Sequence, residues 1–188
     1  MKFGGTSVAD INKINNVADI VLKELKSNKI IVVLSAMAGV TNKMQEYINN
    51  IESNERIEND LILTSGESVT IGILSSILKK RNIKSLPLLG WQVPIVTDDN
   101  HQKAKILNID KKRINTFLEF NDVLVIAGFQ GVDLSGNITS LGRGGSDTTA
   151  VAIASAVNAD RCDIYTDVDG VYSADPNIVS KAKKIPQM

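Results

Sequence analysis

The chain has 188 residues, and its 21 basic and 21 acidic side chains cancel to a formal net charge of zero. This length is enough for one domain with a sizeable core, and the balanced charge provides no positive field for nucleic acid. The longest apolar run, residues 30–40, is interrupted by Ser35 and Gly39 and is shorter than the ~20 residues that span a bilayer. No apolar leader precedes Phe3, so no signal peptide is expected. We therefore expect a small-molecule ligand, with neither nucleic acid nor a membrane as partner.

The elements predicted from hydrophobic periodicity alternate between helices and strands. Apolar residues recur at steps of three and four after Asp10, which predicts an amphipathic helix over residues 10–27, and the branched run Ile30–Leu34 predicts a strand buried on both faces. The alternation continues with helices at 65–80, 111–119 and 148–157, and with strands at 84–89, 122–127 and 161–165. This pattern predicts a three-layer α/β/α sandwich with a mainly parallel central sheet, whose ligands bind at the carboxyl ends of the strands.

Two single residues bear on the compartment and on metal binding. The lone cysteine, Cys162, cannot form an internal disulfide, which favours a reducing compartment, and we expect a buried structural thiol in the cytoplasm. The one histidine, His101, lies in a polar segment without the spacing of a zinc site. We expect it to be a loop residue, and we predict no metal site.

A first glycine-rich segment follows the N-terminus: Lys2-Phe3-Gly4-Gly5-Thr6-Ser7. A cation next to two glycines and two hydroxyls can hold a polyphosphate by charge and backbone amides. The segment is not a Walker A loop, and the spaced glycines of the Rossmann fingerprint are also absent from the sequence. Without further motifs, Lys2 could equally be a solvated terminal lysine.

A second glycine-rich segment, Leu141-Gly142-Arg143-Gly144-Gly145-Ser146-Asp147, leads into the apolar run 148–157. The free amides and the positive dipole end of the expected helix attract an anion, and the planar guanidinium of Arg143 suits a carboxylate or a phosphate. The alternative is an ordinary helix start capped by Ser146 or Asp147.

Taken in order, six motifs closely resemble the catalytic domain of the aspartokinases, within the amino acid kinase superfamily. They are residues 2–7, 34–37 (LSAM), 64–67 (TSGE), 127–131 (AGFQG), 141–147 and 165–176. The resemblance implies transfer of the γ-phosphoryl group of ATP to the side-chain carboxylate of L-aspartate, giving 4-phospho-L-aspartate. This is the first step toward lysine, threonine, methionine and diaminopimelate. An ionised acceptor needs no general base, and Mg²⁺ is expected to be carried by the nucleotide.

The resemblance also implies roles for individual residues. Lys2 and Asp147 would be catalytic, and Glu67 would bind the substrate ammonium group while Arg143 binds its α-carboxylate, with Thr41 and Ser146 beside them. The nucleotide would be bound by Lys2, Phe3, Gly4, Gly5, Ser35, Thr166, Asp167, Tyr172, Asp175 and Pro176. Read without the family, Thr41 could cap a helix, Glu67 could belong to a capping box, and Asp175-Pro176 could simply mark a turn.

The chain also departs from the family pattern at both ends. Only Met1 precedes Lys2, where the family has a longer first strand, and residue 188 comes before a further glycine-containing segment of the family. We therefore expect residues 1–188 to form a single, incomplete amino acid kinase domain with no C-terminal regulatory domain. The alternatives are a non-catalytic fragment that binds ligand, forms a homo-oligomer or joins a separately encoded remainder, and another kinase of the superfamily. Glu67 paired with Arg143 favours a free amino acid as the acceptor.

Overall fold

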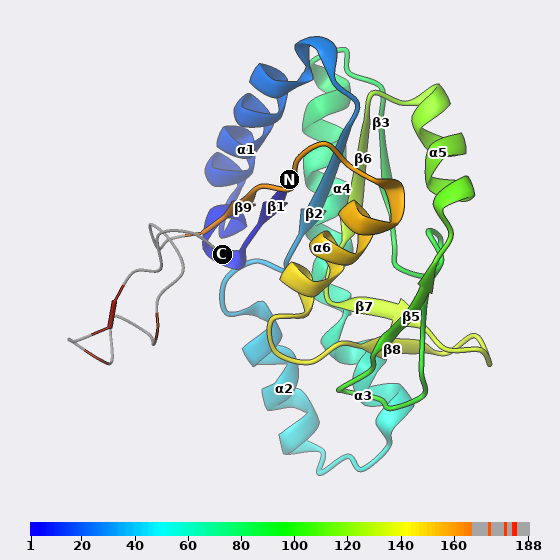
Figure 1. The fold of residues 1–188 in the computed structure, drawn as a ribbon. Coiled ribbons are helices and arrows are strands. Elements are labelled where there is room, and N and C mark those ends of the chain that lie inside the picture. Colours follow the sequence, from blue (N-terminus) through cyan, green and yellow to red (C-terminus); the bar gives the residue numbers. More distant parts are fainter. Residues whose placement is uncertain (167–172, 174–178, 180–181, 184–188) are drawn as a thin grey trace.

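The computed structural model describes residues 1–166, 173, 179 and 182–183, and its centre is a five-stranded sheet (Figure 1). The strand order is β3-β6-β2-β1-β9, and all neighbouring strands run parallel. These strands are β1 (Lys2–Phe3), β2 (Ile30–Leu34), β3 (Ser85–Leu88), β6 (Val123–Ala127) and β9 (Ile164–Tyr165). The prediction of a mainly parallel central sheet is confirmed.

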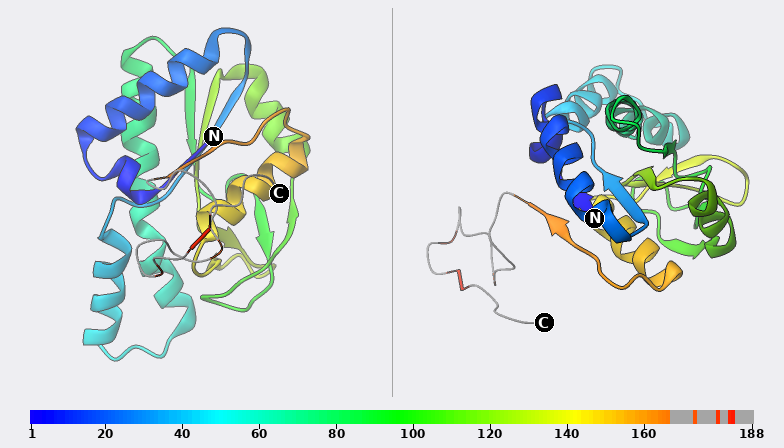
Figure 2. Two further views of the ribbon diagram at one scale, coloured as in Figure 1. Left: turned by 60° about the vertical axis from the view of Figure 1, so that its left-hand side comes forward. Right: turned by 90° about the horizontal axis from the view of Figure 1, so that it is seen from above.

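Helices cover both faces of this sheet (Figures 1 and 2). One face carries α1 (Ile11–Glu24) and α4 (Ser65–Lys80), and the other carries α5 (Lys111–Phe120) and α6 (Gly145–Val157). The continuous apolar runs of β2 and β6 explain this arrangement, because alternate side chains enter the two cores: Val32 and Val125 pack with α1 and α4, whereas Val33 and Leu124 pack on the other side. The three-layer α/β/α architecture is confirmed.

Local signals place most of the predicted boundaries. Asp10 caps α1 by accepting a hydrogen bond from the Lys13 amide at 2.8 Å, and a 3₁₀ turn, η2 (Leu25–Ser27), follows that helix. The helix predicted over residues 65–80 is α4, with the same bounds. The strand predicted over 161–165 is shorter, since β9 begins only at Ile164. Cys162 lies in the preceding loop and is exposed, so the predicted buried thiol is wrong.

A second, smaller sheet was not predicted. It has the order β5-β4-β7-β8, with strands β4 (Ile95–Thr97), β5 (Ile106–Ile109), β7 (Gln130–Val132) and β8 (Ile138–Ser140). Two further helices were also not predicted from the sequence: α2 (Val40–Asn50) and α3 (Arg56–Leu63). In Figure 1 these elements gather at the lower end of the molecule, below the five-stranded sheet.

One stretch of the described residues meets the length and composition of a membrane span, contrary to the sequence expectation. It is Arg56–Lys80, which comprises α3 and α4. Half of its most apolar window is buried inside the fold. The core helix of a globular protein has the same properties, so the stretch is weak evidence for a membrane partner.

Candidate active site

The loops that carry the sequence motifs leave the large sheet side by side. Phe3 is in register with Leu34 and with Tyr165, and Leu34 is in register with Ala127. The segments that begin at Gly4, Ser35, Gly128 and Thr166 therefore emerge at the carboxyl ends of adjacent parallel strands. The prediction that these distant motifs share one rim of the sheet is confirmed.

Lys2 and Asp147 form an ion pair at this rim. The Lys2 Nζ lies 2.6 Å from Asp147 Oδ1, and Lys2 is only 7% exposed, so it is not a solvated terminal lysine. Asp147 lies in the first turn of α6, where the helix dipole favours a negative charge. The pair therefore holds a cation at a fixed position beside the start of a helix.

The glycine loop after β1 comes very close to the loop after β2. A Cβ atom on Gly5 would lie 2.9 Å from the Ala36 carbonyl oxygen, so only glycine fits there. Gly5 begins a 3₁₀ helix, η1 (Gly5–Val8), and its first amides have no intrahelical partner. Gly4 lies close to the Lys2 ammonium group, since a Cβ on Gly4 would be 3.5 Å from Nζ. The Gly4 amide itself donates to the Tyr165 carbonyl at 3.4 Å, so the amides available to a polyphosphate beside the Lys2 cation are the first ones of η1.

Glu67 is a buried carboxylate of which only one oxygen has a hydrogen-bond partner among the described residues. It lies in the first turn of α4 and is 2% exposed, and its Oε1 accepts a hydrogen bond from the Ala36 amide at 3.1 Å. Its Oε2 is buried and has no hydrogen-bond partner among the described residues. Burial raises the pKa of Glu67 to about 7, although the Ala36 amide opposes this shift. Because its bonded oxygen reaches across to the loop after β2, Glu67 is not a capping-box residue.

The second glycine-rich segment connects β8 to α6. Gly142 and Gly144 have φ values of 76° and 74°, on either side of Arg143. Arg143 is exposed, and its guanidinium forms no ion pair within the described part of the chain. The α6 N-cap is Gly144 and no side chain caps it, so the reading of Ser146 or Asp147 as a simple cap is wrong.

Ser146 and Thr41 lie at the starts of two helices. Ser146 is 8% exposed and packs against Gly128, where a Cβ would come within 2.7 Å of the Ser146 Oγ. Thr41 lies in the first turn of α2, whose N-cap is Gly39, so Thr41 does not cap that helix. Both hydroxyl residues therefore lack the capping role that was their main alternative.

Comparison with known proteins identifies the family. The family model described as the amino acid kinase family matches residues 1–188. The chain belongs to this family.

Two relatives and one solved structure narrow the comparison within this family. The chain is 48% identical over 192 residues to an aspartokinase of Rickettsia conorii, covering 100% of the chain and 48% of the relative. It is 49% identical over 191 residues to an aspartate kinase of Pseudomonas fluorescens, with 100% and 46% covered. Among solved structures, aspartokinase III of E. coli in complex with aspartate and ADP superposes with a TM-score of 0.79 at 30% identity, covering 98% of this chain and 52% of that one. The chain thus spans about half the length of the relatives it matches.

The residues predicted to bind a nucleotide are only partly described in this member of the amino acid kinase family. The Phe3 ring is 1% exposed and stacks on the Tyr165 ring with the centroids 4.4 Å apart, so Phe3 can meet a ligand only through its backbone. Ser35 is half-buried in the loop after β2, and its amide donates to the Phe3 carbonyl at 3.3 Å. Thr166 follows the end of β9 and is exposed. The remaining predicted nucleotide residues, Asp167, Tyr172, Asp175 and Pro176, lie outside the described residues.

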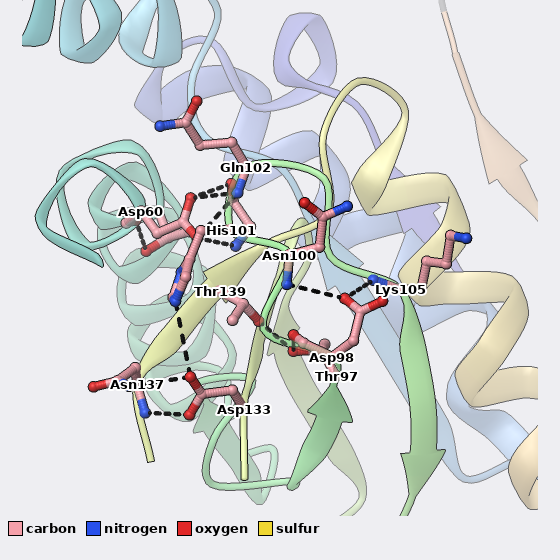
Figure 3. Close-up of polar contacts among 12 residues, drawn as sticks. Asp60, Thr97, Asp98, Asn100, His101, Gln102, Lys105, Asp133, Asn137 and Thr139 are labelled. Atoms are coloured by element: carbon pink, nitrogen blue, oxygen red, sulfur yellow. Dashed lines mark hydrogen bonds and ion pairs between the residues drawn. The ribbon is translucent and has the colours of Figure 1, made fainter. Parts of the chain in front are cut away.

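Sequence reasoning missed a buried polar network in this amino acid kinase fold (Figure 3). His101 lies in a loop, as predicted, but its side chain is only 8% exposed and its Nδ1 lies 2.7 Å from Asp60 Oδ2. Asp60 itself is fully buried. The contact joins residues 41 positions apart, so no local pattern points to it. In the sequence, Asp60 follows Glu58 and Asn59, so nothing marks it as a buried residue.

Proposed function

We propose that this chain forms the nucleotide-binding and aspartate-binding part of an aspartate kinase. The observation that carries the proposal is the half-satisfied carboxylate of Glu67, at the same sheet rim as the Lys2–Asp147 pair. A buried carboxylate oxygen without a partner is costly unless a ligand completes it, and the ammonium group of an amino acid is such a ligand. The aspartokinase and aspartate kinase names of relatives at 48–49% identity support this choice of substrate.

Charge and geometry assign the two ends of the acceptor. The ammonium group would bind Glu67, and the α-carboxylate would take two parallel hydrogen bonds from Arg143, with Ser146 and Thr41 close by. The side-chain carboxylate of the aspartate would then face the Lys2 end of the rim. This arrangement matches a free amino acid rather than an acylated one, because an amide nitrogen carries no charge for Glu67 to bind.

The ATP phosphates fit the glycine loop and Lys2. The first amides of η1, which lack intrahelical partners, and the Lys2 ammonium group would bind phosphate oxygens, while Ser35 and Thr166 would lie on the nucleotide side. A Mg²⁺ ion bound by phosphate oxygens and water would supply further neutralisation of charge. A cytoplasmic location, where ATP and free aspartate are available, belongs to the same proposal.

The chemistry that these residues support is in-line phosphoryl transfer. An oxygen of the ionised aspartate side chain forms a bond to the γ-phosphorus, and the bond from that phosphorus to the bridging oxygen of ADP breaks. No proton has to leave the acceptor, so no base is needed. Lys2 stabilises the negative charge that spreads over the phosphoryl oxygens, and Asp147 fixes its position.

A hydroxamate assay with ATP, Mg²⁺ and aspartate tests the proposal directly. It should trap an acyl phosphate with aspartate, much less with glutamate, and none with N-acetylaspartate, which lacks the ammonium group. The assay is run on the 188-residue chain and on the longest open reading frame that contains it. Binding of aspartate without acyl phosphate in both samples would leave a binding protein rather than a kinase, and a preference for N-acetylaspartate would contradict the role of Glu67.

A further inference from the structure

Asp60 is a buried carboxylate that the proposed chemistry does not use. It lies on α3 with 0% exposure, and every contact to its two oxygens comes from a donor or from the His101 ring. The Ser140 amide and hydroxyl donate to it at 3.0 and 2.6 Å. The Gln102 amide donates to it at 3.1 Å, and His101 Nδ1 lies 2.7 Å away (Figure 3). Asp60 therefore ties α3 to the end of β8 and to the loop between β4 and β5.

The backbone of Asp60 is linked to the start of α4, the helix that carries Glu67. The Thr64 hydroxyl and amide both donate to the Asp60 carbonyl, at 2.8 and 3.0 Å, and α4 begins at the next residue, Ser65. Gln130 holds the same junction, because its side-chain amide donates to the Thr64 carbonyl at 3.1 Å. The position of α3 thus fixes the start of α4, where Glu67 lies in the first turn.

The carboxylate of Asp60 is linked to the segment that carries Arg143. Ser140 is the last residue of β8 and stands directly before the segment 141–144. That segment also rests on Gln102, since a Cβ on Gly142 would lie 3.2 Å from the Gln102 carbonyl oxygen. The carboxylate of Asp60 binds the amides of both Ser140 and Gln102. It therefore anchors the segment that presents the exposed Arg143.

We propose that Asp60 is a positioning residue that sets the spacing between Glu67 and Arg143. It touches neither ligand-binding group, but it binds the element that leads into each of them. This inference rests on the proposed function, in which Glu67 and Arg143 receive the ammonium and carboxylate groups of the acceptor. Among the described residues, neither Lys2 nor the glycine loop contacts the carboxylate of Asp60, so nucleotide binding should not depend on it.

The test is Asp60→Asn, which keeps the shape of the side chain but turns an amide group toward the Ser140 or Gln102 amide. Two donors then face each other, so the anchored segment must shift. We expect the KM for aspartate, and its Kd measured by calorimetry, to rise about tenfold or more, because misplacing a substrate-binding group by a fraction of an ångström is costly. The KM for ATP should stay within about twofold of the unmodified protein.

Asp133→Asn is the matched control. Asp133 is also buried and belongs to the same network, with its Oδ2 lying 3.8 Å from His101 Nε2. Its hydrogen bonds, however, go to Ser135 and Asn137 within the turn between β7 and β8, and not to α3 or Ser140. We expect both KM values of this variant to stay within about twofold of the unmodified protein.

The outcomes separate the possibilities. A rise in both KM values with Asp60→Asn, or an equal rise in aspartate KM with Asp133→Asn, would show a general loss of structure and overturn the inference. If Asp60→Asn does not fold, Ser140→Ala removes only the 2.6 Å hydroxyl contact and should raise the aspartate KM by about threefold; no change would overturn the inference. An unmodified protein that neither binds nor phosphorylates aspartate would instead refute the proposed function, and the inference with it.

Discussion

Asp60 and Glu67 are two buried carboxylates on consecutive helices, and their surroundings differ in one respect. The oxygens of Asp60 are surrounded by hydrogen-bonding groups from Ser140, Gln102 and His101. Glu67 has the Ala36 amide on one oxygen, and its other oxygen has no hydrogen-bond partner within the part of the chain that the structure describes. A buried charge persists in a fold when its hydrogen bonds are complete. Asp60 therefore belongs to the scaffold, and the open oxygen of Glu67 is the reason for proposing that Glu67 binds a ligand.

The comparison between Asp60 and Glu67 is tested first by Glu67→Gln, which should have the largest effect, a loss of affinity for aspartate. The variant keeps an acceptor for the Ala36 amide but loses the negative charge that we propose binds the ammonium group. We expect the affinity for aspartate to fall about 100-fold, because breaking a buried charge pair costs roughly 2–5 kcal/mol. Calorimetric titration with aspartate measures the loss, and ATP titration of the same sample should be unchanged.

Glu119→Gln provides the control for the loss of a negative charge. Glu119 lies on α5 and is exposed, so its replacement should leave the affinity for aspartate unchanged. An equal loss in both variants would show that net charge, and not the Glu67 site, governs binding.

The second test concerns stability against pH. Burial raises the pKa of Glu67 to about 7 in the folded chain, whereas an ordinary glutamate titrates near 4.5. Folding therefore takes up a proton between these values, so the free energy of unfolding falls as the pH rises through this window. The ionised form above pH 7 lowers the stability of the folded chain by about 3 kcal/mol relative to acidic pH.

Urea unfolding at pH 5 and pH 8 measures this change. Other groups contribute their own pH dependence, so the result is the difference between the unmodified chain and Glu67→Gln, which has no titrating group at position 67. We expect the variant to gain up to about 3 kcal/mol relative to the unmodified chain on going from pH 5 to pH 8. Parallel pH profiles would mean that Glu67 is not desolvated.

Much of the fold could be predicted because the large sheet is built from local patterns. The runs of β2 and β6 are apolar throughout, and α1 has an aspartate cap and a clear helical periodicity. The small sheet could not be predicted in this way. Its strand β7 contains Gln130 and Gly131, which have weak strand preference, and it is stabilised by contacts between distant residues.

In the candidate site, too, the parts defined by local sequence could be predicted, and the parts that depend on contacts between distant residues could not. The segments around Lys2, Glu67 and Arg143 could be assigned from continuous motifs, because each motif combines glycines with a charged residue. The environment of Asp60 could not, because its contact with Ser140 joins residues 80 positions apart. The exposure of Cys162 was predicted wrongly for a related reason: β9 is too short to bury the residues that precede it.

Arg143 differs from both buried carboxylates, because it is exposed and forms no ion pair within the described residues. Arg143→Lys keeps the charge but loses the planar fork that donates two parallel hydrogen bonds. We expect the KM for aspartate to rise about tenfold, with the KM for ATP unchanged. Arg56→Lys, at an exposed position on α3, is the control, and steady-state constants equal to those of the unmodified protein in Arg143→Lys would contradict the assignment.

The smallest expected effect is on the stability of variants at Thr97 and Thr139 in the small sheet. These two neutral hydroxyl groups allow the same comparison between a buried polar group that keeps its partner and one that loses it. Their hydroxyl oxygens lie 2.6 Å apart, and the Thr97 hydroxyl donates to the Asp98 carbonyl at 2.9 Å (Figure 3). Thr97 has one proton to donate, so Thr139 must be the donor within the pair. Thr97→Val therefore leaves a buried hydroxyl proton without an acceptor, whereas Thr139→Val leaves Thr97 bonded to Asp98.

We expect Thr97→Val to lower the free energy of unfolding by about 1 kcal/mol more than Thr139→Val does. The double variant should cost no more than Thr97→Val alone, because it removes the stranded hydroxyl together with its former acceptor. Urea unfolding of the three variants at one pH measures the differences. Equal costs for the two single variants would show that an unpaired polar group is tolerated in this sheet, and the distinction between Asp60 and Glu67 would then lose its energetic basis.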